Sequence, residues 1–324
     1  MRRILGLAMV VALLQTPLSA GATNGLECGD VVMQSVSLTH DLIDCPGDGL
    51  VVGANGITIN LGGRTIDGDE TGPSLAGGAG IRVGPGFGNV TITNGTITEF
   101  SEAVTLDSTT GNTVSRLNVA ATTRGINLAN ASANLIEKNA VTTSFLDGIR
   151  VDGAGSDANV VRKNLVQGYV FGITVSNGAD ENLVDKNEVT GGNIGIALFS
   201  GAQETEVTRN DVFGNAVSGI QIQSSSNDAL VSKNMVHENG EGILVDVDVS
   251  GATVSRNEVV ANVGDGIEIR GSNNLVERNV IVDNGGFGIN LTATSSNNTV
   301  RRNHLEGNAL GSIHDAGTGN SVTS

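Results

Sequence analysis

The stretch LVERNVIVDNGGFGINL, residues 275–291, decides the fold of this chain because it recurs along the sequence with small changes. SRNEVVANVGDGIEI (255–269) and SKNMVHENGEGILV (232–245) carry the same pattern upstream. In each copy a basic residue precedes an asparagine, an apolar residue follows two places later, and a Gly-Ile pair comes next. The chain is therefore an internal repeat, and its fold has to explain why an amide stands so regularly inside apolar segments.

The repeat unit is short. Its asparagines lie 22 to 25 residues apart, at Asn139, Asn164, Asn187, Asn210, Asn234, Asn257, Asn279 and Asn303. Apolar residues within a unit alternate with period two, as Ile243, Val245 and Val247 do, and this spacing predicts strands rather than helices. Each unit thus offers two or three strands joined by Gly- and Asn-rich turns, and units bury their apolar sides by stacking in parallel about 4.8 Å apart.

The repeated asparagine fits such a stack at a corner of each coil. Its side chain would point inward, with identical amides one coil above and one coil below, so that donors and acceptors pair up the stack. An orphaned buried amide costs about 1–3 kcal/mol, which favours an unbroken ladder. Asparagine also tolerates the left-handed backbone of a tight corner, so we expect that conformation at these residues.

The pattern NLVERNVIVDNGGFGI (274–289) resembles the right-handed parallel β-helix superfamily, with pectate-lyase-like folds and NosD-type or carbohydrate-associated repeats. The resemblance covers about residues 48–324 and is specific for fold rather than function. It implies an all-β, single-stranded, right-handed parallel β-helix of about 11–12 coils. We expect a signal peptide at 1–22, an N-terminal cap at 23–47 and the β-helix domain at 48–324.

The N-terminus and the charge indicate an exported protein. Arg2 and Arg3 precede an apolar run that is too short for a membrane span, and Ala20-Gly21-Ala22 resembles a cleavage site. We therefore expect secretion or a periplasmic or cell-envelope location, with no membrane span in the mature chain. Cys28 and Cys45 are expected to form one disulfide, and the net charge of −16 argues against nucleic acid as a partner.

The outward-facing residues after each Gly-Ile pair are predicted to form one polar face along the stack. As candidate contacts to an extracellular glycan or an envelope protein we take Asn127, Thr174, Phe199, Gln221, Gln223 and Asn290. In-register stacking would place Asp246 beside Arg270, one coil apart. A regular row of Lys and Arg just before the ladder asparagines could hold an anionic polymer, although neighbouring acidic residues favour a simple compensation of charge.

No compact catalytic motif of the β-helix pectinases stands out: the chain has no GHG, no DD and no DPHE-type segment, and its four histidines are scattered. We therefore expect a non-catalytic module that presents long sheet faces to a glycan or a protein. The alternative is a polysaccharide lyase, hydrolase or epimerase acting on an extended polymer such as a uronate chain. Its candidate catalytic residues are Arg150, Asp152, Asp246, Glu268 and Arg270.

A cofactor is not expected from the sequence. The segment IDGDETG (66–72) nevertheless gathers Asp67, Asp69 and Glu70 in a Gly-rich loop. Several carboxylate oxygens close together are the ligands that Ca²⁺ prefers, so these residues are the candidates if the chain binds calcium.

Overall fold

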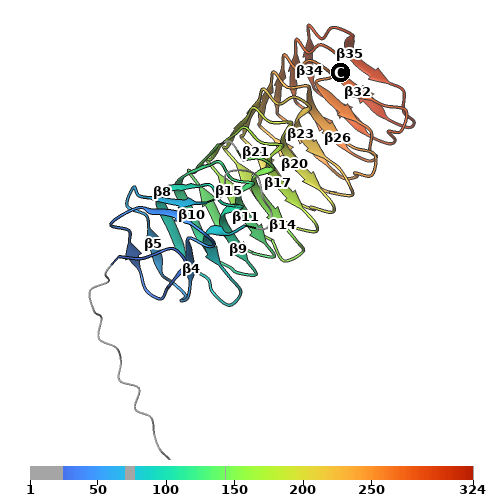
Figure 1. The fold of residues 1–324 in the computed structure, drawn as a ribbon. Helices are drawn as coiled ribbons and strands as arrows, with labels where there is room; N and C mark the ends of the chain where they lie inside the picture. The colour runs from blue at the N-terminus through green and yellow to red at the C-terminus, as the bar shows by residue number, and fades with distance from the viewer. Residues whose placement is uncertain (1–24, 70–76, 143, 324) are drawn as a thin grey trace, which may run out of the picture.

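The computed structural model of the chain describes residues 25–69, 77–142 and 144–323. These residues form an elongated rod of about 12 stacked turns, and every assigned element in them is a β-strand (Figure 1). All pairings between the strands are parallel, and at about 4.8 Å per turn the rod is roughly 58 Å long. The predicted all-β, single-stranded parallel β-helix is confirmed. The predicted signal peptide at 1–22 lies outside the described residues.

Three parallel sheets run along the rod, and we name them A, B and C in chain order within a turn. Sheet A contains β1 (Asp30–Val32), β4 (Leu50–Val52), β7 (Ala79–Val83), β9 (Glu102–Asp107), β11 (Arg124–Ala129), β14 (Asp147–Asp152), β17 (Phe171–Ser176), β20 (Ile194–Phe199), β23 (Ser218–Ile222), β26 (Glu241–Val245), β29 (Ile267–Ile269), β32 (Phe287–Leu291) and β35 (Gly311–Asp315).

Sheet B contains β2 (Val36–Ser37), β5 (Thr58–Asn60), β12 (Leu135–Glu137), β15 (Val160–Arg162), β18 (Leu183–Asp185), β21 (Glu206–Thr208), β24 (Leu230–Ser232), β27 (Thr253–Ser255), β30 (Leu275–Glu277), β33 (Thr299–Arg301) and β36 (Ser321–Thr323). Sheet C contains β3 (Leu42–Cys45), β6 (Thr65–Gly68), β13 (Ala140–Thr142), β16 (Leu165–Gln167), β19 (Glu188–Thr190), β22 (Asp211–Phe213), β25 (Met235–His237), β28 (Glu258–Val260), β31 (Val280–Val282) and β34 (His304–Glu306). Two longer strands, β8 (Thr91–Thr98) and β10 (Thr113–Ala120), continue through both sheets.

The core is a set of vertical rows of branched apolar side chains. In sheet A the isoleucine of each Gly-Ile pair sits directly above its counterpart, as Ile149 does on Ile173 and Ile173 on Ile196, and all three are fully buried. β-Branched side chains suit this pleated, close-packed interior. The in-register stack has a consequence for function, because outward residues about 23 positions apart become neighbours on one face.

The predicted asparagine ladder is present. From Asn139 to Asn303, the side-chain Nδ2 of each ladder asparagine donates to Oδ1 of the next at 2.9 or 3.0 Å. The same Nδ2 also donates to a backbone carbonyl of the preceding turn, as Asn234 does to Val207 at 2.9 Å. Each buried amide is thereby satisfied on both sides, which is the condition for keeping polar groups inside an apolar core.

The corner conformation differs from our expectation. The residue that adopts the left-handed backbone is the basic residue before each ladder asparagine, with φ between 55° and 59° from Lys138 to Arg302. The asparagines themselves are absent from this conformation among the described residues. The turn at the basic residue sends its long side chain to the surface, while the next residue points its amide inward; Lys233 is exposed and Asn234 is buried.

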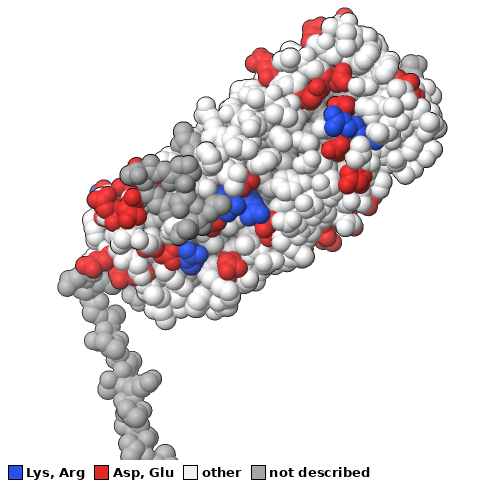
Figure 2. All heavy atoms as spheres, turned by 45° about the vertical axis from the view of Figure 1, so that its right-hand side comes forward, with Lys and Arg blue, Asp and Glu red and all other residues white. Residues whose placement is uncertain are grey.

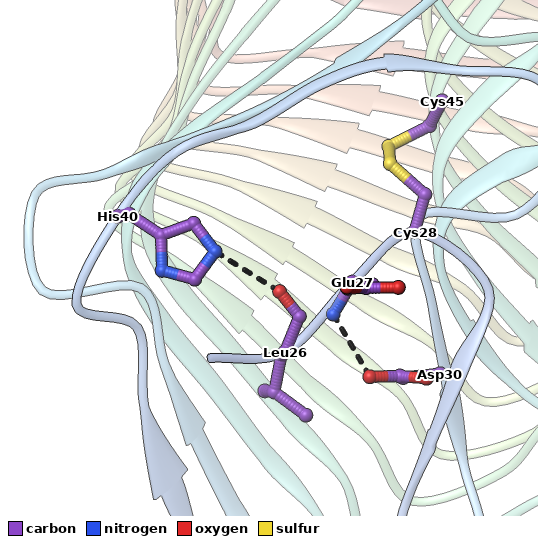
Figure 3. Close-up of a disulfide and its surroundings, with 6 residues drawn as sticks. All are labelled: Leu26, Glu27, Cys28, Asp30, His40 and Cys45. Carbon is purple, nitrogen blue, oxygen red and sulfur yellow. Dashed lines mark hydrogen bonds between the residues drawn. A yellow bond between two sulfur atoms is a disulfide. The ribbon is translucent and has the colours of Figure 1, made fainter. Parts of the chain in front are cut away.

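The N-terminal segment already belongs to the rod, because β1, β2 and β3 pair in parallel with β4, β5 and β6. Cys28 and Cys45 form the predicted disulfide across 17 residues of this first turn (Figure 3). Close by, His40 Nε2 donates to the carbonyl of Leu26 at 3.1 Å, and the Glu27 N–H donates to Asp30 Oδ2 at 2.8 Å. A disulfide fits an extracellular or periplasmic location.

Candidate active site on sheet A

The outer face of sheet A carries charged side chains in separate groups. On the face shown in Figure 2, basic side chains lie in a few clusters, each flanked by acidic ones, with uncharged surface between them. Two clusters are built from several residues of sheet A. We call the one on β26, β29 and β32 the carboxylate cluster, and the one on β9, β11, β14 and β17 the Asn127–Arg150 cluster.

The carboxylate cluster brings together Glu241, Asp265 and Glu268, and one oxygen from each lies within 4.8 Å of the others. Glu241 begins β26, and Asp265 precedes the next strand of sheet A, on which Glu268 lies. Among the described residues this is the group of three acidic side chains close enough to share a metal ion or a proton. Sequence reasoning singled out Glu268 but missed Glu241 and Asp265, because neither is in the row that follows the Gly-Ile pair.

Glycines make room for these carboxylates. A Cβ at Gly264 would stand 2.3 Å from Glu241 Oε1, and a Cβ at Gly286 would stand 2.2 Å from Asp265 Oδ1. Both distances are shorter than any ordinary contact, so only glycine lets the acidic side chains lie against the backbone at these two positions. Gly264 and Gly286 each stand two residues before the glycine of a Gly-Ile pair, and this placement is a signal that could have located the cluster.

Hydrogen bonds hold the three carboxylates differently. Asp265 accepts from the Phe287 N–H at 2.6 Å and from Asn290 Nδ2 at 2.7 Å, while Glu268 accepts from Arg270 at 2.9 and 3.2 Å. Glu241 accepts the Asp265 N–H at 2.6 Å. The pKa of Glu241 is raised, first by burial and then by the charges of Asp265 and Glu268. With its raised pKa, Glu241 keeps a proton to higher pH than a glutamate in water does.

Arg270 connects the cluster to the next row of the face. Its guanidinium lies 3.6 Å from Asp246 Oδ1 and 2.9 Å from Glu268 Oε1. Asp246 and Arg270 are therefore neighbours, as the register of the repeat predicted. The three candidates Asp246, Glu268 and Arg270 therefore meet at one place. Gln221 and Gln223 lie on one turn, which is one turn before Asp246 and two turns before Glu268, and they bond to each other at 3.2 Å. Asn290 reaches the cluster through Asp265.

The Asn127–Arg150 cluster is the other group. Arg124 bridges Glu102 at 3.4 Å and Asp147 at 3.2 Å, and Asn127 Nδ2 donates to Glu102 at 3.0 Å. The candidates Arg150 and Asp152 form an ion pair at 2.8 Å beside this network. Asp147 is buried, and burial raises its pKa against the opposing effect of its hydrogen bond from Thr174 and of the nearby arginines.

Some predicted face residues are less accessible than their positions indicated. Thr174 is 0% exposed and donates its hydroxyl to Asp147 at 2.9 Å, and Asn127 and Gln221 are also buried. Phe199 is half-buried and lies 6.1 Å from Phe171, between ring centroids, on the stretch between the two clusters. The face is thus a packed polar surface in which only parts of the long side chains reach solvent.

The calcium candidates are only partly described. Glu70 lies outside the described residues, Asp69 is exposed, and the pKa of Asp67 is raised by partial burial and by the charges of Glu99 and Asp44. A calcium site in this loop therefore stays a prediction. The described residues contain no helix that is long and apolar enough to span a membrane.

The proton on Glu241 has a measurable effect on stability. Because its pKa is raised in the folded state, the folded chain binds this proton at a higher pH than the unfolded chain does. The resulting stabilisation is present at acid pH and is lost as the pH rises through the folded pKa. We expect Glu241→Gln to melt at a higher temperature than wild type near pH 8, and we expect this advantage to vanish near about pH 4.

Thermal unfolding followed by circular dichroism across that range measures the difference. Glu258→Gln on sheet C is the matched control, because Glu258 is exposed and belongs to neither cluster. An advantage of Glu241→Gln that stays constant with pH, or that the control shares, would contradict a raised pKa at Glu241.

The fold and the face define a class: a parallel β-helix that carries carboxylate clusters on one sheet. The family described as a right-handed β-helix region matches residues 40–212, 125–271 and 184–324, and the chain belongs to this family. A search of curated proteins gives no match.

Solved structures of similar shape come from enzymes that act on carbohydrates. A mutant of the periplasmic alginate epimerase AlgG superposes with a TM-score of 0.72 at 14% identity, over 85% of this chain and 76% of the other. The A-module of the mannuronan C-5 epimerase AlgE4 of Azotobacter vinelandii gives 0.65 at 16% identity, over 92% and 91%. DFA-IIIase of Arthrobacter chlorophenolicus A6 without its lid gives 0.55 at 16% identity, over 83% and 71%. At such identities the likeness shows the fold alone.

The expectation of a non-catalytic module is wrong on these findings. The matched structures are carbohydrate-modifying enzymes by name, and they support the alternative of a polysaccharide-modifying enzyme better than the main interpretation. The physical reason for the error is that the acidic groups are assembled from different turns. A search for a compact motif in one segment cannot detect Glu241, Asp265 and Glu268, which meet only when the coils stack.

Proposed function

We propose that this chain is a carbohydrate-modifying enzyme that acts on an extended glycan lying along sheet A, and that it cleaves glycosidic bonds at the carboxylate cluster. The observation that carries the proposal is the approach of Glu241, Asp265 and Glu268 to within 4.8 Å. Glycoside hydrolysis uses two carboxyl groups, one protonated and one ionised, on either side of the scissile bond.

Glu241 and Glu268 suit the two roles. Glu241, with its raised pKa, is the general acid that protonates the glycosidic oxygen as the bond to the anomeric carbon breaks. Glu268 attacks that carbon and forms a glycosyl-enzyme intermediate. The Glu241 carboxylate then takes a proton from water, whose oxygen displaces Glu268 and restores both side chains. Arg270 holds Glu268 in place through two hydrogen bonds.

The spacing favours this double displacement. Carboxyl groups about 5–5.5 Å apart are typical of retaining enzymes, whereas about 6.5–9.5 Å leaves space for a water molecule in inverting ones. The short separation in the cluster fits the first class. Lyases and epimerases need a positive group that neutralises a substrate carboxylate, and Arg270 is already engaged by Glu268 and Asp246, so hydrolysis is the better supported reaction.

A panel of polymers tests the proposal. The purified protein is incubated with alginate, pectate, hyaluronan, a fructan and neutral glucans, while new reducing ends and the ultraviolet absorbance of unsaturated products are followed. We expect new reducing ends without unsaturated products on at least one polymer. Unsaturated products would indicate a lyase and overturn the hydrolytic mechanism, and the absence of new reducing ends on every polymer would oppose hydrolysis at the carboxylate cluster.

We also propose that residues 1–22 direct export and that the mature enzyme meets its glycan outside the cytoplasm. The charge pattern of the first residues and the Cys28–Cys45 disulfide support this location. N-terminal sequencing of the protein recovered from outside the cytoplasm should begin near Thr23. Recovery of the chain with Met1 intact would contradict cleavage. The acidic net charge of −16 again argues against nucleic acid as a partner.

A further inference from the structure

The Asn127–Arg150 cluster contains a buried polar atom that the fold leaves without a partner. Asn127 is 6% exposed, and its Oδ1 is the buried side-chain oxygen or nitrogen that lacks a hydrogen-bond partner in the described part of the chain. Its Nδ2 is satisfied by Glu102 at 3.0 Å. An unpaired buried acceptor destabilises a fold, and it persists where another demand, such as a ligand's donor, requires it.

A charged donor lies on the neighbouring turn of the stack. Arg150 is the in-register neighbour of Asn127 on the next turn, and its side chain is 21% exposed. Its guanidinium contacts Asp152 at 2.8 Å, and Asp152 also accepts from Ser176 and Asn177 at 2.7 Å. A ligand reaches Asn127 Oδ1 only if neighbouring side chains shift. The long side chain of Arg150 can move aside and still donate hydrogen bonds from its remaining N–H groups.

The two clusters lie on one path. Arg150 and Glu268 occupy the same row of sheet A, five turns apart, which is about 24 Å. Between them the row holds the uncharged residues Thr174, Ala197, Gln221 and Leu244, all buried. Beside it Phe171 and Phe199 form a half-buried pair of rings that a sugar ring can cover. A glycan chain that crosses this row therefore meets no charged side chain in it.

We propose that the Asn127–Arg150 cluster is a remote subsite for the same glycan, which makes the enzyme select long chains over short ones. This inference rests on the proposed function. A sugar hydroxyl donates to Asn127 Oδ1, and a sugar oxygen accepts from Arg150. A disaccharide at the carboxylate cluster cannot reach across about 24 Å, so only longer chains gain these contacts.

A length series of oligosaccharides from the polymer that the enzyme cleaves tests the subsite. For wild type we expect kcat/KM to rise with length and to level off once the chain spans both clusters. In wild type, the ratio of kcat/KM for the longest oligosaccharide to that for the shortest measures the advantage of length. Asn127→Ala should lower this ratio by about two- to tenfold, which corresponds to the loss of one hydrogen bond. Arg150→Gln is the second variant and should remove a similar factor. Asn118→Ala is the matched control, because Asn118 is exposed on sheet C.

Binding provides a readout that is independent of turnover. Titration calorimetry of the longest oligosaccharide against Glu241→Gln protein should show weaker binding when Asn127→Ala is added. A kcat/KM that is independent of length in wild type, or equal length profiles for Asn127→Ala, Arg150→Gln and Asn118→Ala, would overturn the remote subsite alone. Undiminished activity of Glu241→Gln would instead overturn the proposed function, so the two failures are distinguishable.

Discussion

Asn234→Leu should lower the free energy of unfolding by about 3–5 kcal/mol, the largest effect on stability that we expect from one side chain. Asn234 Nδ2 donates to the carbonyl of Val207 and to Asn257 Oδ1, both at 2.9 Å. Its Oδ1 accepts from the backbone N–H and the side chain of Asn210 at 2.9 and 3.0 Å. Leucine removes all four bonds and leaves buried groups on both neighbouring turns unpaired, at about 1–3 kcal/mol each.

Lys233→Leu is the matched control for this change. Lys233 is the adjacent residue, exposed and at the left-handed corner, and it receives the same substitution. We expect its effect to stay within about 0.5 kcal/mol, as for most surface substitutions. Chemical denaturation of the three proteins measures the difference. Equal stabilities for the two variants would mean that the ladder does not hold the turns together.

The largest expected effect on activity belongs to Glu241→Gln, which should lower kcat by about 10²–10⁴-fold on the polymer that the wild type cleaves. Glutamine keeps the size of the side chain and can still accept the Asp265 N–H, but it cannot transfer a proton to the glycosidic oxygen. Because the raised pKa of Glu241 keeps the acid protonated to higher pH, the wild-type rate should fall on the alkaline side as this group ionises.

Glu258→Gln should leave both the rate and its pH profile unchanged, since Glu258 lies on sheet C, at an exposed position of β28. Circular dichroism of each variant establishes that the fold is retained. A Glu241→Gln protein with the rate and the alkaline limb of wild type would exclude Glu241 as the general acid and, with it, the mechanism proposed for the cluster.

Much of the fold could be predicted from the repeat. The period of 22 to 25 residues, the Gly-Ile pairs and the ladder from Asn139 to Asn303 define the parallel stack and its register. A further ladder was missed: Asn134, Asn159 and Asn182 are linked in the same way, at 3.0 and 3.1 Å. Its signal was in the sequence, because these asparagines stand five residues before Asn139, Asn164 and Asn187.

The corner geometry could not be read from residue preferences. Asparagine tolerates the left-handed region better than lysine or arginine does, yet the fold gives that conformation to the basic residue before it. The asparagine amide stabilises the fold more inside the ladder, where it makes up to four hydrogen bonds, than it would at the turn. Tertiary hydrogen bonding therefore outweighs the local backbone preference at every one of these corners.

The site was only half predictable. The row after the Gly-Ile pair located Asp246, Glu268 and Arg270 on one face, and their contact follows from the register alone. Glu241 and Asp265 lie just before the strand core, where the chain bends into sheet A, and the side-chain direction there does not follow simple alternation. The burial that raises the pKa of Glu241, and the orphaned oxygen of Asn127, arise only from packing between turns.

The anomeric configuration of the first product tests directly whether the carboxylate cluster acts as a retaining glycoside hydrolase. Nuclear magnetic resonance during the early minutes of cleavage records it before the sugar equilibrates in water. With carboxyl groups as close as those of Glu241 and Glu268, we expect retention of configuration. Inversion, or product formation that continues undiminished in Glu241→Gln, would contradict it.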